Sequence, residues 1–221
     1  MKMDKKTFRV FIVLAVAALA CTCDLLPGAE TPPPPSPQAD ALFQDDFSDP
    51  GSGWEEEDYE SGSVGYKDGA YSVTSIVDSA TMWGVANRSF DNFIIEVDAT
   101  QVSAGPDGNN DYGVVCREQG DGNGYYLLVS GDGFYAILRA EDGEYAPLVE
   151  WVESSAIRQG NATNHLRVIC DGSKLELFVN GQHLATAEDS TYTSGDIALT
   201  ATTYEEESTE VHFDNLVVSK P

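Results

Sequence analysis

Residues 42–221 are predicted to form an all-β domain, an antiparallel β-sandwich. Apolar residues recur at every second position in short runs, such as residues 93–97 and 175–179, which is the period of a strand with one buried face. Gly, Asn and Asp separate these runs, and no helical period lasts for three turns. About a dozen strands in ~180 residues fit one sandwich better than two domains.

The clearest local element is a predicted hairpin over residues 174–187. Two alternating runs flank the dipeptide Asn180-Gly181. Asn-Gly favours the two-residue type I′ turn, because both central residues of that turn need positive φ. Further turns are predicted at Asp68-Gly69, Gly131-Asp132-Gly133, Asp142-Gly143 and Asp171-Gly172.

Residues 1–20 resemble a bacterial lipoprotein signal peptide. Four basic residues precede an apolar run over residues 10–20, which is about half of the ~20 residues that a membrane-spanning helix needs. The sequence Ala18-Leu19-Ala20-Cys21 resembles a lipobox, with Ala18 where the motif prefers Leu. The resemblance implies cleavage before Cys21 and acylation of this cysteine, which would anchor the protein in a membrane. An ordinary signal peptide is the alternative.

Residues 21–41 form a predicted Pro-rich linker, with four consecutive prolines at 32–35 and another at Pro37. Such a segment acts as a semi-rigid spacer. We therefore expect an exported protein, lipid-anchored to the cell membrane or envelope, with its domain on the extracytoplasmic side.

The chain is strongly acidic, with 37 acidic and 12 basic residues. Loss of residues 1–20 leaves 36 acidic and 8 basic residues, a net charge of −28. Electrostatic repulsion from this negative charge excludes nucleic acid and anionic lipid surfaces as partners. Membrane contact is therefore expected only through the lipid anchor. Cationic or neutral ligands fit the charge, as does a role in solubility alone. No oligomeric state is predicted.

Two cysteines are predicted to form a disulfide. Cys116 shares its strand phase with Val114, and Cys170 shares its phase with Val168, so both point into a core. Export would bring them into an oxidising environment, and closing a loop of about 54 residues would contribute ~4 kcal/mol of stability. Two separate buried thiols are the alternative. Cys23 has no predicted role.

Seven segments carry a resemblance to a known fold: residues 43–49 with Trp54, 93–98, 111–117, 164–168, 177–181, 195–199 and 211–216. Their order is similar to that of the concanavalin A-like jelly rolls, near the laminin-G-like lectins and the domain family named for 3-keto-disaccharide hydrolases. The resemblance covers nearly all of the domain and implies a jelly-roll sandwich. These segments are strand and hairpin signatures, so they indicate the fold better than the chemistry.

No catalytic constellation stands out in the sequence. Jelly-roll glycosidases carry a Glu-x-Asp-x-Glu type of motif, and retaining hydrolysis needs two carboxylates ~5 Å apart. Glu96 and Asp98 share a strand face, but Thr100 and Gln101 stand where the second glutamate is needed. A non-catalytic module is therefore favoured. The alternative that the resemblance implies is a hydrolase or lyase acting on 3-keto-disaccharides or related glycosides.

The resemblance also implies a structural calcium ion between the first and last strands. Asp45, Asp46 and Asp214 lie in the corresponding segments, and carboxylate oxygens are ligands that Ca²⁺ prefers. Three ordinary solvated aspartates are the alternative. No other cofactor is expected.

Strand alternation predicts a ligand-binding face. With Cys116, Cys170, Phe134, Ala136 and Leu138 inward, the outward set is Arg117, Tyr126, Tyr135, Arg139 and Arg167, with Trp83 and Trp151 at the rim. Aromatic rings and guanidinium groups are suited to sugars, so a glycan is predicted on a concave face of the sandwich. The alternatives are a structural face, with the arginines paired to Glu96, Glu118 or Glu176, or a protein-binding surface lipoprotein.

Overall fold

A computed structural model describes residues 41–221. The predicted signal peptide, Cys21, Cys23 and nearly all of the Pro-rich linker lie outside these residues. Within residues 41–221, no helix is both long enough and apolar enough to cross a membrane.

The described residues form strands, with a single short 3-10 turn at Pro50–Ser52. The strands are β1 (Ala41–Asp45), β2 (Glu57–Tyr59), β3 (Gly62–Lys67), β4 (Ala70–Ser75), β5 (Thr81–Val85), β6 (Phe93–Ser103), β7 (Asn110–Glu118), β8 (Gly124–Ser130), β9 (Phe134–Glu141), β10 (Glu144–Glu153), β11 (Thr163–Asp171), β12 (Lys174–Val179), β13 (Gln182–Glu188), β14 (Asp196–Thr203) and β15 (Thr209–Ser219).

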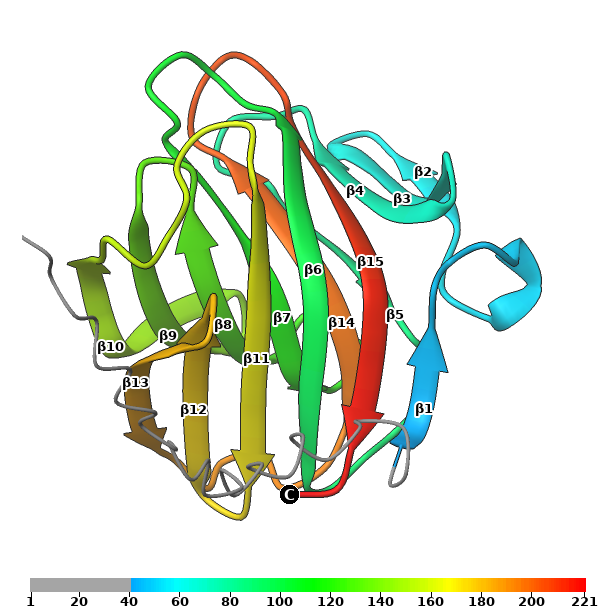
Figure 1. Cartoon of the computed structure of the whole chain (residues 1–221), viewed down its shortest axis with the longest axis vertical. Helices are drawn as coiled ribbons and strands as arrows, with labels where there is room; N and C mark the ends of the chain where they lie inside the picture. Colours follow the sequence, from blue (N-terminus) through cyan, green and yellow to red (C-terminus); the bar gives the residue numbers. More distant parts are fainter. Residues whose placement is uncertain (1–40) are drawn as a thin grey trace, which may run out of the picture. The chain divides into compact units, whose positions relative to one another are not determined.

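These strands build two antiparallel sheets that pack face to face (Figure 1). One sheet has nine strands in the order β13-β12-β11-β6-β15-β4-β3-β2, with β1 also paired to β15. The other has six strands in the order β10-β9-β8-β7-β14-β5. The predicted concanavalin A-like jelly-roll sandwich is confirmed.

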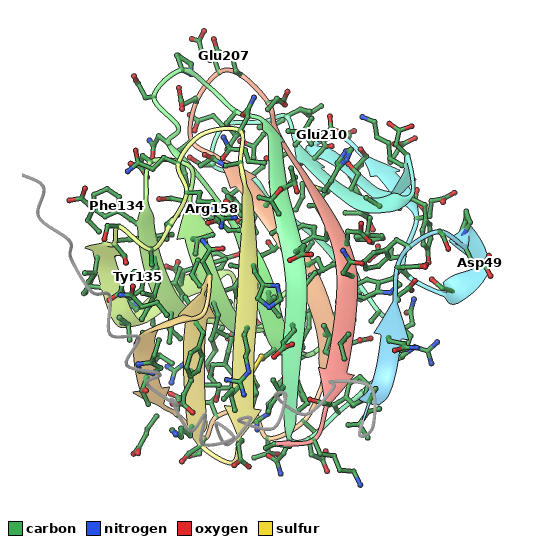
Figure 2. The ribbon with its side chains drawn as sticks, in the orientation of Figure 1. Asp49, Phe134, Tyr135, Arg158, Glu207 and Glu210 are labelled. Atoms are coloured by element: carbon green, nitrogen blue, oxygen red, sulfur yellow. A yellow bond between two sulfur atoms is a disulfide. The ribbon has the colours of Figure 1, made fainter. Side chains whose placement is uncertain are left out.

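The core lies between the sheets and is closed by the disulfide. Tyr112 and Val114 from β7 pack in the same cluster as Leu166 and Val168 from β11. Cys116 of β7 is bonded to Cys170 of β11, with Cα atoms 6.8 Å apart, and the sulfur–sulfur bond is visible in Figure 2. The predicted disulfide is therefore confirmed, and it joins the six-stranded sheet to the nine-stranded sheet.

The predicted hairpin is also confirmed. β12 pairs with β13, and the connecting residues Asn180 and Gly181 have φ angles of 51° and 82°. Two consecutive positive φ angles are what a type I′ turn requires.

Candidate ligand-binding groove

The candidate site lies on the outer face of the six-stranded sheet, on the side away from the core. Strand registers align its outward side chains in three rows across the sheet. The rows contain Val85, Ala198, Val115, Tyr126 and Leu138; Trp83, Thr200, Gly113, Leu128 and Ala136; and Thr81, Thr202, Asp111 and Ser130. Because the first two rows are mostly apolar and the third is polar, the face has an apolar floor bordered by hydroxyl and carboxyl groups.

A hollow of about 260 Å³, here called the central hollow, opens over this floor. Its bottom is formed by Tyr126, Leu128 and Leu138. Its wall comes from the edge strand β10, which supplies Tyr145 and Trp151. The rings of Tyr126 and Tyr145 meet edge to face at 5.2 Å between centroids, so the exposed ring of Tyr145 is held in place by a buried one.

Two further hollows adjoin the central one, and the three together are called the groove. The loop hollow, about 490 Å³, shares Asp111, Trp151 and Tyr204 with the central hollow and reaches Asp132 and Phe134 at the β8–β9 turn. The edge hollow, about 930 Å³, shares only Thr81 with the central hollow and extends around Trp83 at the opposite edge of the sheet. Figure 2 labels Phe134 and the next residue in β9, Tyr135.

Asp111 is the most perturbed carboxyl group in the groove. It is 2% exposed, and its Oδ2 accepts a hydrogen bond of 2.9 Å from the Tyr204 hydroxyl. Burial raises the pKa of Asp111 to about 6, although hydrogen bonds from Tyr204 and Thr202 act in the opposite direction. A perturbed carboxyl group in a hollow is a candidate functional residue.

A short loop between β7 and β8 holds Trp83 in place in the edge hollow. The Glu118 carboxylate accepts hydrogen bonds of 2.8 Å from the backbone N–H groups of Gly120 and Gly122. Gly122 has a φ of +83°, and a Cβ atom at this position would lie 3.0 Å from the Trp83 ring. Only glycine therefore lets the loop approach the indole this closely without strain.

A family model describing a 3-keto-alpha-glucoside-1,2-lyase-like domain matches residues 39–219. The chain belongs to this family. No protein of curated function matches the chain. Membership in this lyase-like family supports a carbohydrate-related function.

Several solved structures have the same fold as this lyase-like domain. The carbohydrate-binding module CBM66 from Bacillus subtilis is 18% identical, with a TM-score of 0.62, and the match covers 76% of this chain and 96% of the module. The Bacillus licheniformis beta-glucanase is 13% identical, with a TM-score of 0.60, and the match covers 83% of this chain and 100% of the glucanase. At these identities the similarity shows the fold alone.

Three of the seven predicted ligand-binding residues lie in the groove of the lyase-like domain. Trp83 lines the edge hollow, Tyr126 the central hollow, and Trp151 both the central and the loop hollows. Trp151 is 39% exposed, whereas Tyr126 is 1% exposed and forms part of the floor.

The predicted outward position of Arg117 is wrong. Its side chain is fully buried, and the guanidinium donates hydrogen bonds to the carbonyl oxygens of Asp91, Gly172 and Tyr192 at 2.8–3.1 Å, and to the side chain of Asn92. The cause is a register shift between β7 and β14, because Cys116 and Glu118 pair with consecutive residues. Arg117 is the extra residue, with φ of +57°, and such a bulge turns its side chain inward.

The predicted phase of β9 is also wrong. Tyr135 and Ile137 pack against the main core, whereas Ala136 and Leu138 belong to the outer-face cluster. Arg139 follows the inner phase and pairs with Asp189 at 2.9 Å and with Glu141 at 3.3 Å. Apolar side chains occupy both faces of this strand, so alternation alone does not distinguish the two phases.

Arg167 points outward as predicted, but from the other sheet. It lies on β11, where Nε is 3.1 Å from Glu96 Oε1 and the guanidinium sits 4.9 Å from the centre of the Phe178 ring. Because the disulfide links opposite sheets, the outward residues beside its two cysteines face away from each other. The predicted convergence of Arg117, Arg139 and Arg167 on one face is therefore wrong.

The sequence-based prediction missed four polar or aromatic residues that line the central hollow: Asp111, Tyr145, Glu150 and Tyr204. Asp111 directly precedes the apolar part of β7, and its phase matches that of Val115. Alternation from Val115 could have placed Asp111 outward. The other three lie on an edge strand and a loop, where alternation carries little information.

The three aspartates predicted to hold calcium do not form one site. Asp45 and Asp46 line a hollow of about 400 Å³ with Asn215, and Asp45 Oδ2 is buried without a hydrogen-bond partner in the described part of the chain. Asp214, however, lies opposite Asp98 of β6 in the backbone register of the nine-stranded sheet. Residues 41–221 contain no group of three or more His, Cys, Asp or Glu side chains placed to hold a metal ion, so a calcium site built from these three aspartates does not fit.

Proposed function

We propose that the protein is a cell-envelope lipoprotein whose domain binds a carbohydrate-type ligand in the groove without catalysing a reaction. The observation that carries the proposal is the pair of exposed aromatic side chains, Tyr145 and Trp151, standing beside an apolar floor with polar groups at its border. Such rings pack on the apolar faces of sugars, and the neighbouring polar groups can bond the hydroxyls.

The size and shape of the groove support a glycan rather than a small isolated ligand. The loop and edge hollows, about 490 and 930 Å³, fall within the range of ~300–1,000 Å³ that is typical of ligand pockets. The central hollow shares lining residues with both of them. A ligand with several repeating units fits adjoining hollows better than one that fills a single cavity.

Several carboxylates of the groove already have structural partners, which favours binding over hydrolysis. Glu118 accepts two backbone N–H groups, and Asp196 accepts the N–H groups of Arg88 and Ile197. Glu55 accepts hydrogen bonds from Val85 N–H and the Tyr59 hydroxyl. These carboxylates hold loops and strand ends in position.

Asp111 supports a second candidate function, a lyase acting on 3-keto-glucosides. Elimination next to a ketone needs a base that removes the adjacent proton, and a carboxyl group with a pKa of about 6 suits that task near neutral pH. The name of the family points to the same reaction class. In this case Asp111 would be the base, with Tyr204 as its hydrogen-bond partner.

One pair of measurements tests both candidates. Calorimetric titration of the full chain with a panel of oligosaccharides should give binding that Trp151→Ala and Tyr145→Ala each weaken about tenfold, equivalent to ~1.4 kcal/mol. The same preparation is incubated with a 3-keto-glucoside. Turnover that Asp111→Asn abolishes would establish the lyase and contradict the non-catalytic proposal. No binding to any glycan and no turnover would contradict both.

The lipid anchor is tested separately. Cells fed a labelled fatty acid should incorporate the label into the wild-type protein but not into Cys21→Ser, and the wild type should partition into detergent. Cys23→Ser is the matched control and should keep the label. Labelling of Cys21→Ser would contradict the proposed anchor.

A further inference from the structure

The groove is lined by acidic residues and by no basic ones among the residues that the structure describes. Its acidic residues are Glu55, Asp111, Glu118, Asp132, Glu150 and Asp196. None of the six forms an ion pair within residues 41–221. A ligand bearing carboxylate or sulfate groups would meet repulsion along the whole groove.

Most basic residues of the domain are engaged elsewhere. Arg88 lies next to the edge hollow, but its guanidinium donates to the carbonyl oxygen of Ser52 and stacks over the ring of Phe43. Arg117 is buried between the sheets, Arg139 pairs with Asp189, and Arg167 pairs with Glu96 on the opposite sheet. Lys67 and Lys174 likewise pair with glutamates on the nine-stranded sheet. No lysine, arginine or histidine among the described residues lines any of the three hollows.

The loop hollow is also lined by a buried residue, Asn110, with a hydrogen-bond acceptor that lacks a donor. Asn110 is 2% exposed. Its Nδ2 donates to Gln101 at 3.1 Å, but its Oδ1 has no partner within the described domain. Beside it, Asp132 accepts a hydrogen bond from the Ser130 hydroxyl through Oδ1. A buried acceptor without a donor costs free energy, which a donor on a ligand would recover.

Aromatic rings surround these acceptors. Phe134, Trp151 and Tyr204 line the same hollow as Asn110 and Asp132. A cation is stabilised both by carboxylates and by the faces of aromatic rings, and an ammonium group supplies three donors and no acceptor. The loop hollow thus combines the features that suit a protonated amine.

We infer that the groove selects glycans that carry a protonated amine, such as unacetylated glucosamine units, with the ammonium group in the loop hollow between Asp111 and Asp132, and that it excludes uronic-acid and sulfated glycans. This inference rests on the proposed glycan-binding function. It assigns the charge class of the ligand and one subsite.

Four tetrasaccharides of similar size test the inference by calorimetric titration of the full chain: those of glucosamine, N-acetylglucosamine, glucose and galacturonic acid. Titrations are made above the pKa of Asp111, about 6, and below the pKa of the sugar amine, at moderate salt. The glucosamine tetramer should bind at least about tenfold tighter than its N-acetylated form, a difference of ~1.4 kcal/mol, and the galacturonic acid tetramer should not bind.

Two charge-matched variants separate site binding from general attraction to an acidic protein. Asp132→Asn should remove most of the advantage of glucosamine. Asp68→Asn changes the charge equally in an exposed turn outside the groove, at a φ of 54° that asparagine accepts, and should leave the advantage intact. Equal loss in both variants, equal affinity for the acetylated tetramer, or binding of galacturonic acid would overturn the inference while the glycan-binding proposal stands. Absence of binding to all four would contradict that proposal as well.

Discussion

The two outer faces of the sandwich use their charged residues in opposite ways. On the nine-stranded sheet, acidic side chains meet basic ones, as in Glu96–Arg167, Glu176–Lys174 and Glu210–Lys67. On the six-stranded sheet, the acidic residues of the groove have no ion-pair partner within residues 41–221. Exposed ion pairs contribute little stability, about 0–1 kcal/mol each, but they neutralise a face. The face that stays unneutralised is the one with hollows and aromatic walls.

The largest expected effect comes from replacing the same residue type in two places. Arg117→Met should lower the free energy of unfolding by ~3–5 kcal/mol, because several buried carbonyl groups would lose their donors. Arg167→Met, on the nine-stranded face, should cost ~0–1 kcal/mol. Urea unfolding of both variants measures the two values. Equal costs would mean that the exposed pair of Arg167 with Glu96 carries as much structure as the buried Arg117, and the view that charge on the nine-stranded face only neutralises it would fail.

The titration of Asp111 gives the second effect. In the folded protein this group keeps its proton up to about pH 6, whereas its ordinary pKa is 3.8. The folded state therefore binds more protons between these two values, so the contribution of Asp111 to stability falls as pH rises through this window, by ~3 kcal/mol in total.

Asp111→Asn should remove this dependence. The stability of the variant relative to wild type should increase by about that amount between pH 4 and pH 7, as measured by urea unfolding at both pH values. Glu210, on the nine-stranded face, provides the contrast. Burial raises the pKa of Glu210, but hydrogen bonds from Lys67 and His212 outweigh burial and hold this pKa below its ordinary value. Parallel pH profiles for wild type and Asp111→Asn would contradict the prediction.

The smallest expected effect distinguishes the aromatic residues of the two faces. Trp151→Ala should weaken glycan binding about tenfold, or ~1.4 kcal/mol, with little change in melting temperature because Trp151 is 39% exposed. Phe178→Ala, which removes the ring that contacts Arg167 on the opposite face, should leave binding unchanged. If Phe178→Ala weakened binding and Trp151→Ala did not, the ligand would bind on the nine-stranded sheet and not in the groove.

The features predicted well from the sequence depend on local chemistry. The Asn180-Gly181 turn is specified by the φ angles that those two residues accept. The partnership of Cys116 with Cys170 follows from strand phase, since a core between two sheets brings inward sulfurs together. The order of the seven strand and hairpin segments along the chain was sufficient to predict the jelly-roll fold.

The features predicted poorly depend on which sheet a strand joins. Alternation correctly turned Arg167 outward, but it did not show that β11 and β7 lie in different layers. A single extra residue at Arg117 reversed the local phase. In β9, apolar residues on both faces concealed which side was inner. Trp83 and Trp151 do line the groove, from the edge strands β5 and β10, but their part in binding stays a prediction.

The irregular edge strand that carries Trp151 has a consequence for solubility. An uncovered strand can recruit a strand from another molecule, and proteins discourage this with proline, charge and bulges. β10 has all three: Pro147 cannot donate a backbone hydrogen bond, glutamates occupy both of its ends, and its register with β9 shifts on either side of Val149. The rim of the groove can therefore stay open to a ligand without becoming a template for aggregation.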